Sequence, residues 1–249
     1  MYESTAVGLY DRCPAPDFAP VLRFVESVAP SPGRVFDVGC GTGSLLRLLH
    51  DRGWAVEGCD PSVAMVQAAR TKNPYARISV AGCSDFLPAV APDLITSTFD
   101  VVNHLPSLRS IRDFLYRARR ALPRGGVLVF DAVTPDDIDR NWSRYVDVDR
   151  LADTVLVRSG KRLGPARGLL LYEYFVRQGR DTCRMHVERH ILRSASRQWF
   201  SKNLRDAGFS KLNFVDAASL LPPGRRSVRW LIAATATGSV PNPVGRWIR

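Results

Sequence analysis

The stretch Arg34-Val35-Phe36-Asp37-Val38-Gly39-Cys40-Gly41-Thr42-Gly43 decides the fold of this chain. Its apolar run meets an acid and breaks into alternating glycines, and leucines at helical spacing follow over residues 44–49. This pattern predicts a strand, a tight turn and a helix. Glycine permits positive φ in the turn and lets a ligand approach the main chain, beside the free N–H groups of the next helix. The turn is therefore a candidate ligand site.

The glycine spacing indicates which ligand the turn binds. A dinucleotide fingerprint needs G-x-G-x-x-G, but counting from Gly39 and Gly41 puts Ser44 at the third position. The third glycine, Gly43, comes one residue early. Asp37 lies two residues before Gly39, where a carboxylate would repel a phosphate and attract a cation. The spacing therefore disfavours a pyrophosphate and favours a cationic ligand.

A second predicted strand supports a ligand site. Residues 54–60 form a short run that ends in Asp60, and Pro61-Ser62 opens a predicted helix. Asp60 lies 17 residues after Gly43. This separation is close to the ~20 residues by which a ribose-binding acid follows a nucleotide-binding loop. Two linked signals at this separation are stronger evidence than a glycine turn alone.

The motif Asp37-x-Gly39-x-Gly41-x-Gly43 resembles the first motif of the class I S-adenosylmethionine (SAM)-dependent methyltransferases. The resemblance implies SAM as cofactor, which is cationic at its sulfonium and its amino group, with Asp60 holding both ribose hydroxyls. It also implies a doubly wound, seven-stranded, mostly parallel Rossmann-like sheet with an N-terminal helical cap and an inserted antiparallel lid sheet. The cofactor contacts expected on this basis are Asp37, Gly39, Cys40, Gly41, Gly43, Asp60, Pro61, Cys83, Ser84, Asp85 and Phe99.

The exit of the third predicted strand departs from the family pattern. Many relatives place an Asp after the strand to receive the adenine amino group, followed by a loop that ends in Asp-Phe. Aligning Asp85-Phe86 with that Asp-Phe puts Gly82 where the first acid would be. Adenine recognition is then expected from backbone groups near Cys83 and Ser84, or from Asp85 shifted inward.

The sequence divides into five expected parts. After about Val133 the βα alternation gives way to alternating segments with glycine-containing turns, at residues 154–158, 169–176 and 182–191. These segments predict an antiparallel lid sheet. The expected parts are an N-terminal cap (1–30), a SAM-binding core (31–135), a lid insertion for the acceptor (136–195), a closing part of the core (196–238) and a tail (239–249).

The exit of the fourth predicted strand is where the methyl group should be transferred. Residues 98–105 resemble small-molecule methyltransferases, including glycine N-methyltransferase-like and amino-sugar N-methyltransferases, and contain no Asn-Pro-Pro-Tyr or Asp-Pro-Pro-Tyr motif. The imidazole of His104 suits a general base, but a capping or packing role is equally open. The resemblance also makes Tyr10 a pocket and catalytic candidate, and packing of the cap is its alternative.

The lid is expected to read the acceptor. Aromatic walls with a few polar groups are typical of a small-ligand pocket. His186, Glu188 and His190 share one face of a strand, but a spacing of ~7 Å at i,i+2 disfavours a metal site. The expected acceptor contacts are Tyr10, Asn103, His104, Trp142, Tyr145, Tyr172, Tyr174 and Glu188, and no metal ligands are expected.

Composition limits the other classes of function. The chain has 249 residues and a net charge of +11, but its basic residues are mainly scattered arginines, so a nucleic-acid partner is disfavoured. The five cysteines never take C-x-x-C spacing. The sequence has no run of 18 apolar residues and starts without a signal pattern, so we expect a cytoplasmic protein without a membrane partner. A homo-oligomer is left open.

These features predict an enzyme that methylates an amine nitrogen of a small molecule, plausibly in specialised metabolism. O-methylation of a hydroxyl or carboxyl is the close alternative. A nucleic-acid or carrier-protein methyltransferase and a non-catalytic SAM-binding protein are further alternatives. The sequence leaves open the acceptor, the atom methylated and the number of methyl groups added.

Overall fold

A computed structural model describes residues 16–238 and contains a seven-stranded sheet in the order β10-β11-β5-β4-β1-β2-β3. The strands from β3 to β5 pair in parallel, whereas β11 is antiparallel to both of its neighbours. The predicted class of fold is therefore confirmed. The strands are β1 (Arg34–Val38), β2 (Ala55–Asp60), β3 (Arg77–Val80), β4 (Leu94–Ser97), β5 (Val127–Val133), β10 (Phe209–Asp216) and β11 (Arg229–Ala236). Tyr10 and the tail 239–249 lie outside the described residues.

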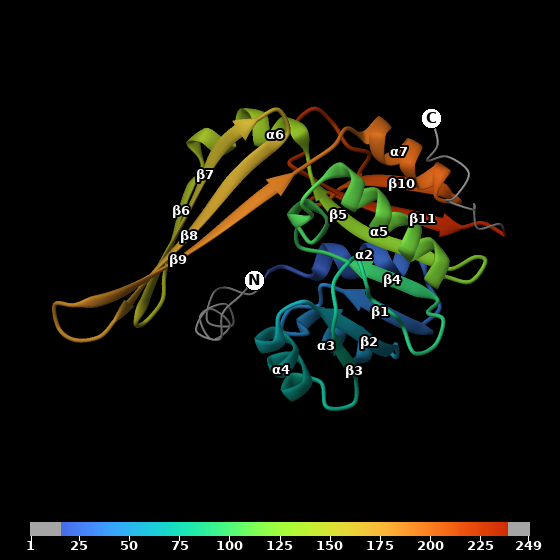
Figure 1. The fold of residues 1–249 in the computed structure, drawn as a ribbon, viewed down its shortest axis with the longest axis horizontal. Coiled ribbons are helices and arrows are strands. Elements are labelled where there is room, and N and C mark those ends of the chain that lie inside the picture. The colour runs from blue at the N-terminus through green and yellow to red at the C-terminus, as the bar shows by residue number, and fades with distance from the viewer. Residues whose placement is uncertain (1–15, 239–249) are drawn as a thin grey trace.

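Helices cover both faces of this sheet (Figure 1). In β1, Val35 packs with α2 and α3 on one face, whereas Phe36 and Val38 pack with α5 and α7 on the other. This alternation follows from the period of two in a strand, and burial on both faces explains the apolar run in the sequence. The helices are α2 (Ala19–Val28), α3 (Ser44–His50), α4 (Val63–Lys72), α5 (Leu108–Ala121), α6 (Pro135–Arg140) and α7 (Arg197–Asp206).

Serine side chains fix where three of these helices begin. The hydroxyls of Ser62, Ser107 and Ser196 each accept a hydrogen bond from the backbone N–H three residues later, at the starts of α4, α5 and α7. Gly43 precedes α3 instead, with φ +79°. The helix that follows the glycine turn therefore begins without a capping side chain, and its first N–H groups stay close to the turn.

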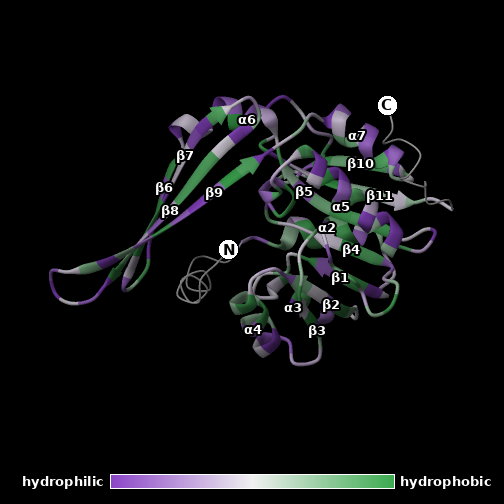
Figure 2. Cartoon of the chain, in the orientation of Figure 1, coloured by the Kyte–Doolittle hydropathy of each residue, from purple (hydrophilic) through white to green (hydrophobic). Residues whose placement is uncertain are grey.

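A second, four-stranded antiparallel sheet projects from the core as a long twisted arm, residues 146–193 (Figure 1). It is the inserted sheet predicted from the alternating segments. Its first strand, β6, is not predicted by the sequence, because five residues at a sheet edge carry little periodic signal. Figure 2 shows a mainly hydrophobic central sheet and a hydrophilic tip of the β8–β9 hairpin. The strands are β6 (Val146–Arg150), β7 (Thr154–Gly164), β8 (Arg167–Arg177) and β9 (Cys183–Arg193).

Two residues hold the arm on the core. The Asn103 side chain donates to the carbonyl of Arg193 at 2.6 Å and accepts from the N–H of Val133 at 3.0 Å. Trp142, in the short 3-10 helix η2 (Trp142–Arg144), is buried against Gly168, where a Cβ would lie 2.3 Å from the indole ring. Both side chains therefore belong to the joint between arm and core. Within residues 16–238, no helix is long and apolar enough to cross a membrane.

Candidate cofactor and acceptor site

A cavity of about 620 Å³ opens at the carboxyl ends of β1, β2 and β4. The strand order reverses here, because β1 pairs with β2 on one side and with β4 on the other. Ligands of open α/β sheets bind at such a point. Of the predicted cofactor and acceptor residues, those that line the cavity are Asp37, Gly39, Cys40, Gly41, Asp60, Pro61, Cys83, Ser84, Phe99 and His104.

The three glycines of the turn serve different purposes. All have positive φ, +77° at Gly39, +54° at Gly41 and +79° at Gly43. A Cβ at Gly39 would lie 2.5 Å from Val101, and a Cβ at Gly43 would lie 2.4 Å from Asn73. A Cβ at Gly41 would meet no protein atom within 4 Å. Gly39 and Gly43 are therefore needed for packing, whereas Gly41 leaves the main chain open to a ligand.

Replacement of Gly41 with Ala should separate ligand binding from folding. We expect a loss of about 1 kcal/mol in the free energy of unfolding, the cost of placing a side chain at positive φ. Affinity for S-adenosylhomocysteine should fall at least tenfold, because the added methyl group points into the cavity. Gly125→Ala is the matched control, since its φ is +86° with open space around it and it lies outside the cavity lining. Equal affinities of the two variants in calorimetric titration would contradict this role of Gly41.

Two buried acids form the floor of the cavity. The carboxylate of Asp60 accepts from the N–H of Gly41 at 3.0 Å and from the N–H of Ser62 at 2.9 Å. Burial raises the pKa of Asp60. Burial also raises the pKa of Asp37 to about 7, against a hydrogen bond from Thr96, and the charge of Asp60 adds to the rise. No Lys or Arg is among the described residues that line the cavity. A cation therefore fits this site and a phosphate does not.

The loop after β3 explains the departure from the family pattern. The carboxylate of Asp85 accepts from the N–H of Gly82 at 2.8 Å, within its own turn, and Asp85 does not line the cavity. Cys83 and Ser84 do line it. Asp85 therefore lies within its own turn, and adenine recognition by backbone groups near Cys83 and Ser84 stays a prediction.

The loop after β4 brings Phe99 and His104 to the cavity. Phe99 and Asp100 both have positive φ, +62° and +69°, which is rare for two consecutive non-glycine residues. The Phe99 ring packs edge-on against Phe18, just before α2, with ring centres 4.8 Å apart. The first turn of the N-terminal helix thus closes one side of the cavity. Sequence reasoning did not predict Phe18 as a site residue, although it is the first residue of that helix's apolar face.

His104 is held by two ring contacts. It lies at the end of the 3-10 helix η1 (Val102–His104), and Ser107 rather than His104 caps α5. Its Nδ1 is 2.8 Å from the carbonyl oxygen of Asp100, and its Nε2 is 3.3 Å from Nδ1 of His190 on β9. Surrounding protein atoms lower the pKa of His104, although solvent still reaches the ring through the open cavity. His190 also lines the cavity and was not among the predicted acceptor contacts.

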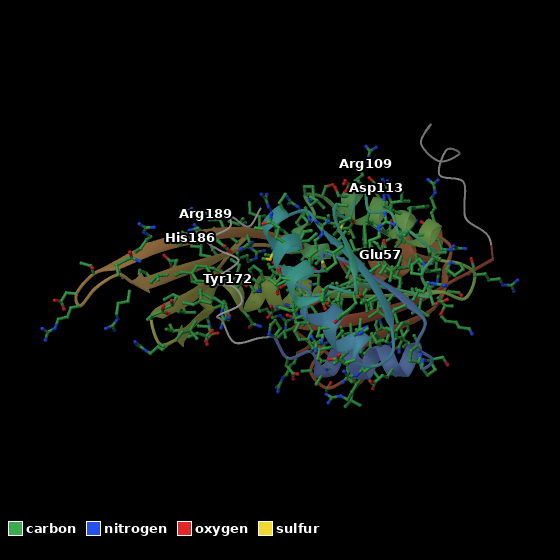
Figure 3. All side chains as sticks on the ribbon, turned by 90° about the horizontal axis from the view of Figure 1, so that it is seen from below. Glu57, Arg109, Asp113, Tyr172, His186 and Arg189 are labelled. Atoms are coloured by element: carbon green, nitrogen blue, oxygen red, sulfur yellow. The ribbon has the colours of Figure 1, made fainter. Side chains whose placement is uncertain are left out.

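The remaining predicted acceptor residues divide into two groups. Tyr172, Tyr174 and Glu188 lie on the face of the arm that carries His190, and the ring centres of Tyr172 and His190 are 5.0 Å apart. Figure 3 shows Tyr172 and His186 on the half of the arm nearer the core. Asn103 and Trp142 are instead buried in the joint, and Tyr145 is exposed at the start of β6, outside the cavity lining. The sequence could not separate these groups, because joints and pockets both favour aromatic and amide side chains.

The open α/β sheet, the glycine turn and the acidic cavity at the reversal of strand order define a class I SAM-dependent methyltransferase fold. The family described as a methyltransferase domain matches residues 16–214. The chain therefore belongs to this family, and SAM is its cofactor.

Relatives of known sequence extend the comparison. The chain is 28% identical over 194 residues to dTDP-3-amino-3,6-dideoxy-alpha-D-glucopyranose N,N-dimethyltransferase of Streptomyces fradiae, a match that covers 77% of this chain and 76% of that protein. It is 32% identical over 136 residues to trans-aconitate 2-methyltransferase of an Acidovorax species. That second match covers 53% of this chain and only 50% of that relative's length.

Solved structures share the fold over nearly the whole chain. A SAM-dependent methyltransferase from Clostridium acetobutylicum superposes with a TM-score of 0.80 at 18% identity, covering 93% of this chain and 97% of that one. A SAM-bound amino pentose methyltransferase from Micromonospora echinaspora superposes with a TM-score of 0.75 at 22% identity, covering 95% and 98%. At these identities the likeness establishes the fold alone.

Proposed function

We propose that this methyltransferase transfers a methyl group to an amine nitrogen of a small molecule in specialised metabolism. The observation that carries the proposal is the charge of the cavity. Besides Asp37 and Asp60, which we assign to SAM, its lining contains the acid Asp113 and, among the described residues, no Lys or Arg. Such a lining attracts a cationic amine more strongly than a carboxylate or a phosphate. The Streptomyces fradiae relative, named as an amino-sugar N,N-dimethyltransferase, supports the same acceptor class.

O-methylation is the second candidate. The match to trans-aconitate 2-methyltransferase favours it, but that match covers only 53% of this chain and 50% of the relative. A carboxyl acceptor would need cationic partners near the reacting oxygen, and the described cavity lining provides only the imidazoles of His104 and His190. An acceptor screen should therefore start with amines and use hydroxyl and carboxyl compounds as the comparison set.

The residues of the cavity would hold SAM by its charge and its ribose. The carboxylate of Asp37 would attract the amino group or the sulfonium, and the oxygens of Asp60 would bind ribose hydroxyls. When bound, SAM supplies an electrophilic methyl group. The protein then has to orient the acceptor nitrogen, exclude water and keep that nitrogen unprotonated. Orientation alone can account for ~7–11 kcal/mol of a barrier in favourable cases.

The acceptor would lie between the cavity and the arm. Glu188 and Tyr172, on the face of the arm that carries His190, stay candidate contacts, and His104 in the cavity lining is the candidate proton acceptor. Tyr174 is only 1% exposed and packs against Leu156, so it would support this face rather than contact the acceptor. Tyr10 stays a candidate contact outside the described residues. Asn103, Trp142 and Tyr145 are not included, because the first two hold the joint and the third is exposed elsewhere.

Calorimetric titration with S-adenosylhomocysteine tests the assignment of Asp60. We expect Asp60→Ala to weaken binding about 100-fold, because each hydrogen bond to a charged group contributes about 1.5–3 kcal/mol. Asp51→Ala is the control, since Asp51 forms only an exposed ion pair with Arg47.

Methyl transfer from SAM to the amine, hydroxyl and carboxyl sets is then followed by mass spectrometry. Turnover of hydroxyl or carboxyl compounds without turnover of amines would reject the proposed acceptor class.

A further inference from the structure

Three ionisable side chains form a continuous chain of contacts at the mouth of the cofactor cavity. Nε2 of His104, from the core, is 3.3 Å from Nδ1 of His190, from the arm. Nε2 of His190 is in turn 3.1 Å from Oε2 of Glu188. Both imidazoles line the cavity. The chain therefore runs from the expected position of the acceptor into the arm.

The outer contacts of this chain fix which ring nitrogens carry protons. A backbone carbonyl can only accept, so Nδ1 of His104 must donate to the carbonyl of Asp100. A carboxylate can also only accept, so Nε2 of His190 must donate to Glu188. With both rings neutral, two lone pairs then face each other across 3.3 Å. One additional proton between Nε2 of His104 and Nδ1 of His190 satisfies both nitrogens at once.

Glu188 is placed to stabilise that additional proton. Its side chain is 10% exposed, and its Oε1 accepts no hydrogen bond from the described residues. Nε2 of His186 lies 3.7 Å from Oε1. A buried carboxylate is costly unless positive charge lies beside it. A proton taken up by the His104–His190 pair supplies this charge, so Glu188 and the protonated pair stabilise each other.

The other ionisable groups near the pair are mostly bound to partners of their own, and the carbonyl and the charge of Asp100 favour the protonated form of His104. Asp113 lines the same cavity and pairs with Arg109 at 3.9 Å, and the side chain of Asp100 is bound to Arg229. Tyr172 packs on the His190 ring. Surrounding protein atoms lower the pKa of His104, which keeps its ring unprotonated at neutral pH, so a counter-charge beside the pair is needed to hold an added proton. The pair is complete only when the arm lies against the core, because each element contributes one imidazole.

We infer that His104 and His190 act as one proton-accepting unit, with Glu188 as its counter-charge, that takes the proton from the acceptor ammonium before methyl transfer. The inference rests on the proposed amine acceptor. In this step one N–H bond of the ammonium breaks, and its electron pair stays on the acceptor nitrogen as the lone pair that attacks the methyl group. The proton forms an N–H bond at Nε2 of His104 and is shared with Nδ1 of His190. The positive charge moves from the acceptor to the pair.

Imidazole NMR tests the unit without any acceptor. The chain has 4 histidines, and His50, which stacks on Tyr75 outside the cavity lining, is an internal reference. In the wild-type protein bound to S-adenosylhomocysteine, the His104 and His190 signals should change with one common midpoint as pH is varied. In Glu188→Gln the common midpoint, read at His104, should fall by about one pH unit or more, because the variant removes the carboxylate that lies 3.1 Å from Nε2 of His190. Independent midpoints, or a His104 midpoint that Glu188→Gln leaves unchanged, would overturn the inference.

Matched variants separate this role from a structural one. Glu173→Gln removes a carboxylate from β8 beside Val187, on the opposite face of the arm, and should leave the His104 midpoint unchanged. His190→Asn places an amide near the position of the replaced Nδ1, but an amide cannot take up a proton. The low-pH limb of the pH profile of kcat/KM for an amine acceptor should therefore change. In Glu188→Gln that limb should move to lower pH with the NMR midpoint, and kcat should fall about tenfold or more.

The two proposals fail in different ways. The protein could bind S-adenosylhomocysteine and show a common histidine midpoint but methylate no amine. This result would reject the amine acceptor and with it the proton transfer step. Amine methylation with independent histidine midpoints would reject the unit and leave the proposed function standing. Glu188→Gln could shift the NMR midpoint of the histidines and still leave kcat and its pH dependence unchanged. This result would overturn the inference that the unit takes part in turnover.

Discussion

Asp37→Asn should weaken cofactor binding about 100-fold at pH 8 and at the same time make the ligand-free protein more stable above pH 7. The pKa of Asp37 is raised from 3.8 to about 7 in the folded chain, chiefly by burial. A raised acid pKa means that folding favours the protonated form. The wild-type free energy of unfolding therefore loses this contribution as pH rises from about 4 to about 7. Asn removes the ionisation and can still accept the hydrogen bond from Thr96, which is 2.7 Å from Oδ1.

The size of the gain follows from the difference in pKa. One pKa unit corresponds to 1.36 kcal/mol, so the variant should gain up to about 4 kcal/mol at pH 8 and progressively less toward pH 4. Urea unfolding at several pH values measures this difference. Asp51→Asn, at an exposed ion pair, is the control and should shift stability by less than about 0.5 kcal/mol. If the variant gains the same free energy of unfolding at pH 4 and at pH 8, the ionisation of Asp37 is not the cause of the gain.

Binding should change in the opposite direction to stability. The ammonium group of S-adenosylhomocysteine, which lacks the sulfonium of SAM, prefers the carboxylate form, so wild-type affinity for this ligand should rise with pH and level off above about 7. Asp37→Asn should bind about 100-fold more weakly at pH 8 and lose this pH dependence, as calorimetry can show. A buried acid that costs stability until a cation binds is the arrangement expected of a binding site rather than of a core. Affinity of the variant equal to wild type would remove Asp37 from the cofactor site.

The strand, turn and helix around the cofactor could be predicted from sequence because the signal is local. Asp37, the glycines and Asp60 lie within a short stretch, and the periodicity of two and of 3.6 residues fixes which ends meet. The same reasoning placed His186, Glu188 and His190 on one face of a strand. It could not show that this face meets His104, because the contact joins residues 86 positions apart, one in the 3-10 helix η1 of the core and the other in the sheet of the arm.

The joint and the β4 exit show where such reasoning fails. Asn103 bonds to Arg193, 90 residues away, so a polar side chain next to a catalytic candidate has a structural use that its neighbours in sequence do not reveal. Phe99 and Asp100 both adopt positive φ. No propensity predicts this for non-glycine residues, because it is imposed by contacts from elsewhere in the fold. Those contacts come from Asp131 and Arg229.

Arg229→Met should destabilise the protein by about 3 kcal/mol at pH 8 and weaken cofactor binding. Arg229, the first residue of β11, forms ion pairs with Asp131 and with Asp100, the latter at 2.8 Å. The Asp131 carboxylate is 3% exposed and also accepts from the N–H of Asp100 at 3.1 Å. Loss of the guanidinium leaves two carboxylates side by side without a cation, and breaking a buried ion pair this way costs about 3–5 kcal/mol. Partial exposure of Arg229 puts the expected cost at the lower end.

The effect should reach the cavity through the backbone. Asp131 and Arg229 hold Asp100 at φ +69°, and the preceding Phe99, at φ +62°, lines the cofactor cavity together with Val101. Positive φ costs roughly 1–2 kcal/mol at each such residue, so this loop should relax once the ion pairs are lost. Affinity for S-adenosylhomocysteine should then fall at least tenfold. Arg226→Met, at an exposed position just before β11, is the matched control and should change neither quantity.

A second substitution and a change of pH distinguish lost charge balance from lost packing. Burial raises the pKa of Asp131 and the charge of Arg229 lowers it, so without Arg229 the pKa rises further. The folded variant can then take up a proton at Asp131, and its deficit in urea unfolding should shrink as pH falls toward 5. Asp131→Asn alone should destabilise, but in the Arg229→Met background it should restore part of the stability, because the amide oxygen can still accept from Asp100. A deficit independent of pH, or one that Asp131→Asn deepens, would mean that Arg229 acts through its aliphatic chain rather than its charge.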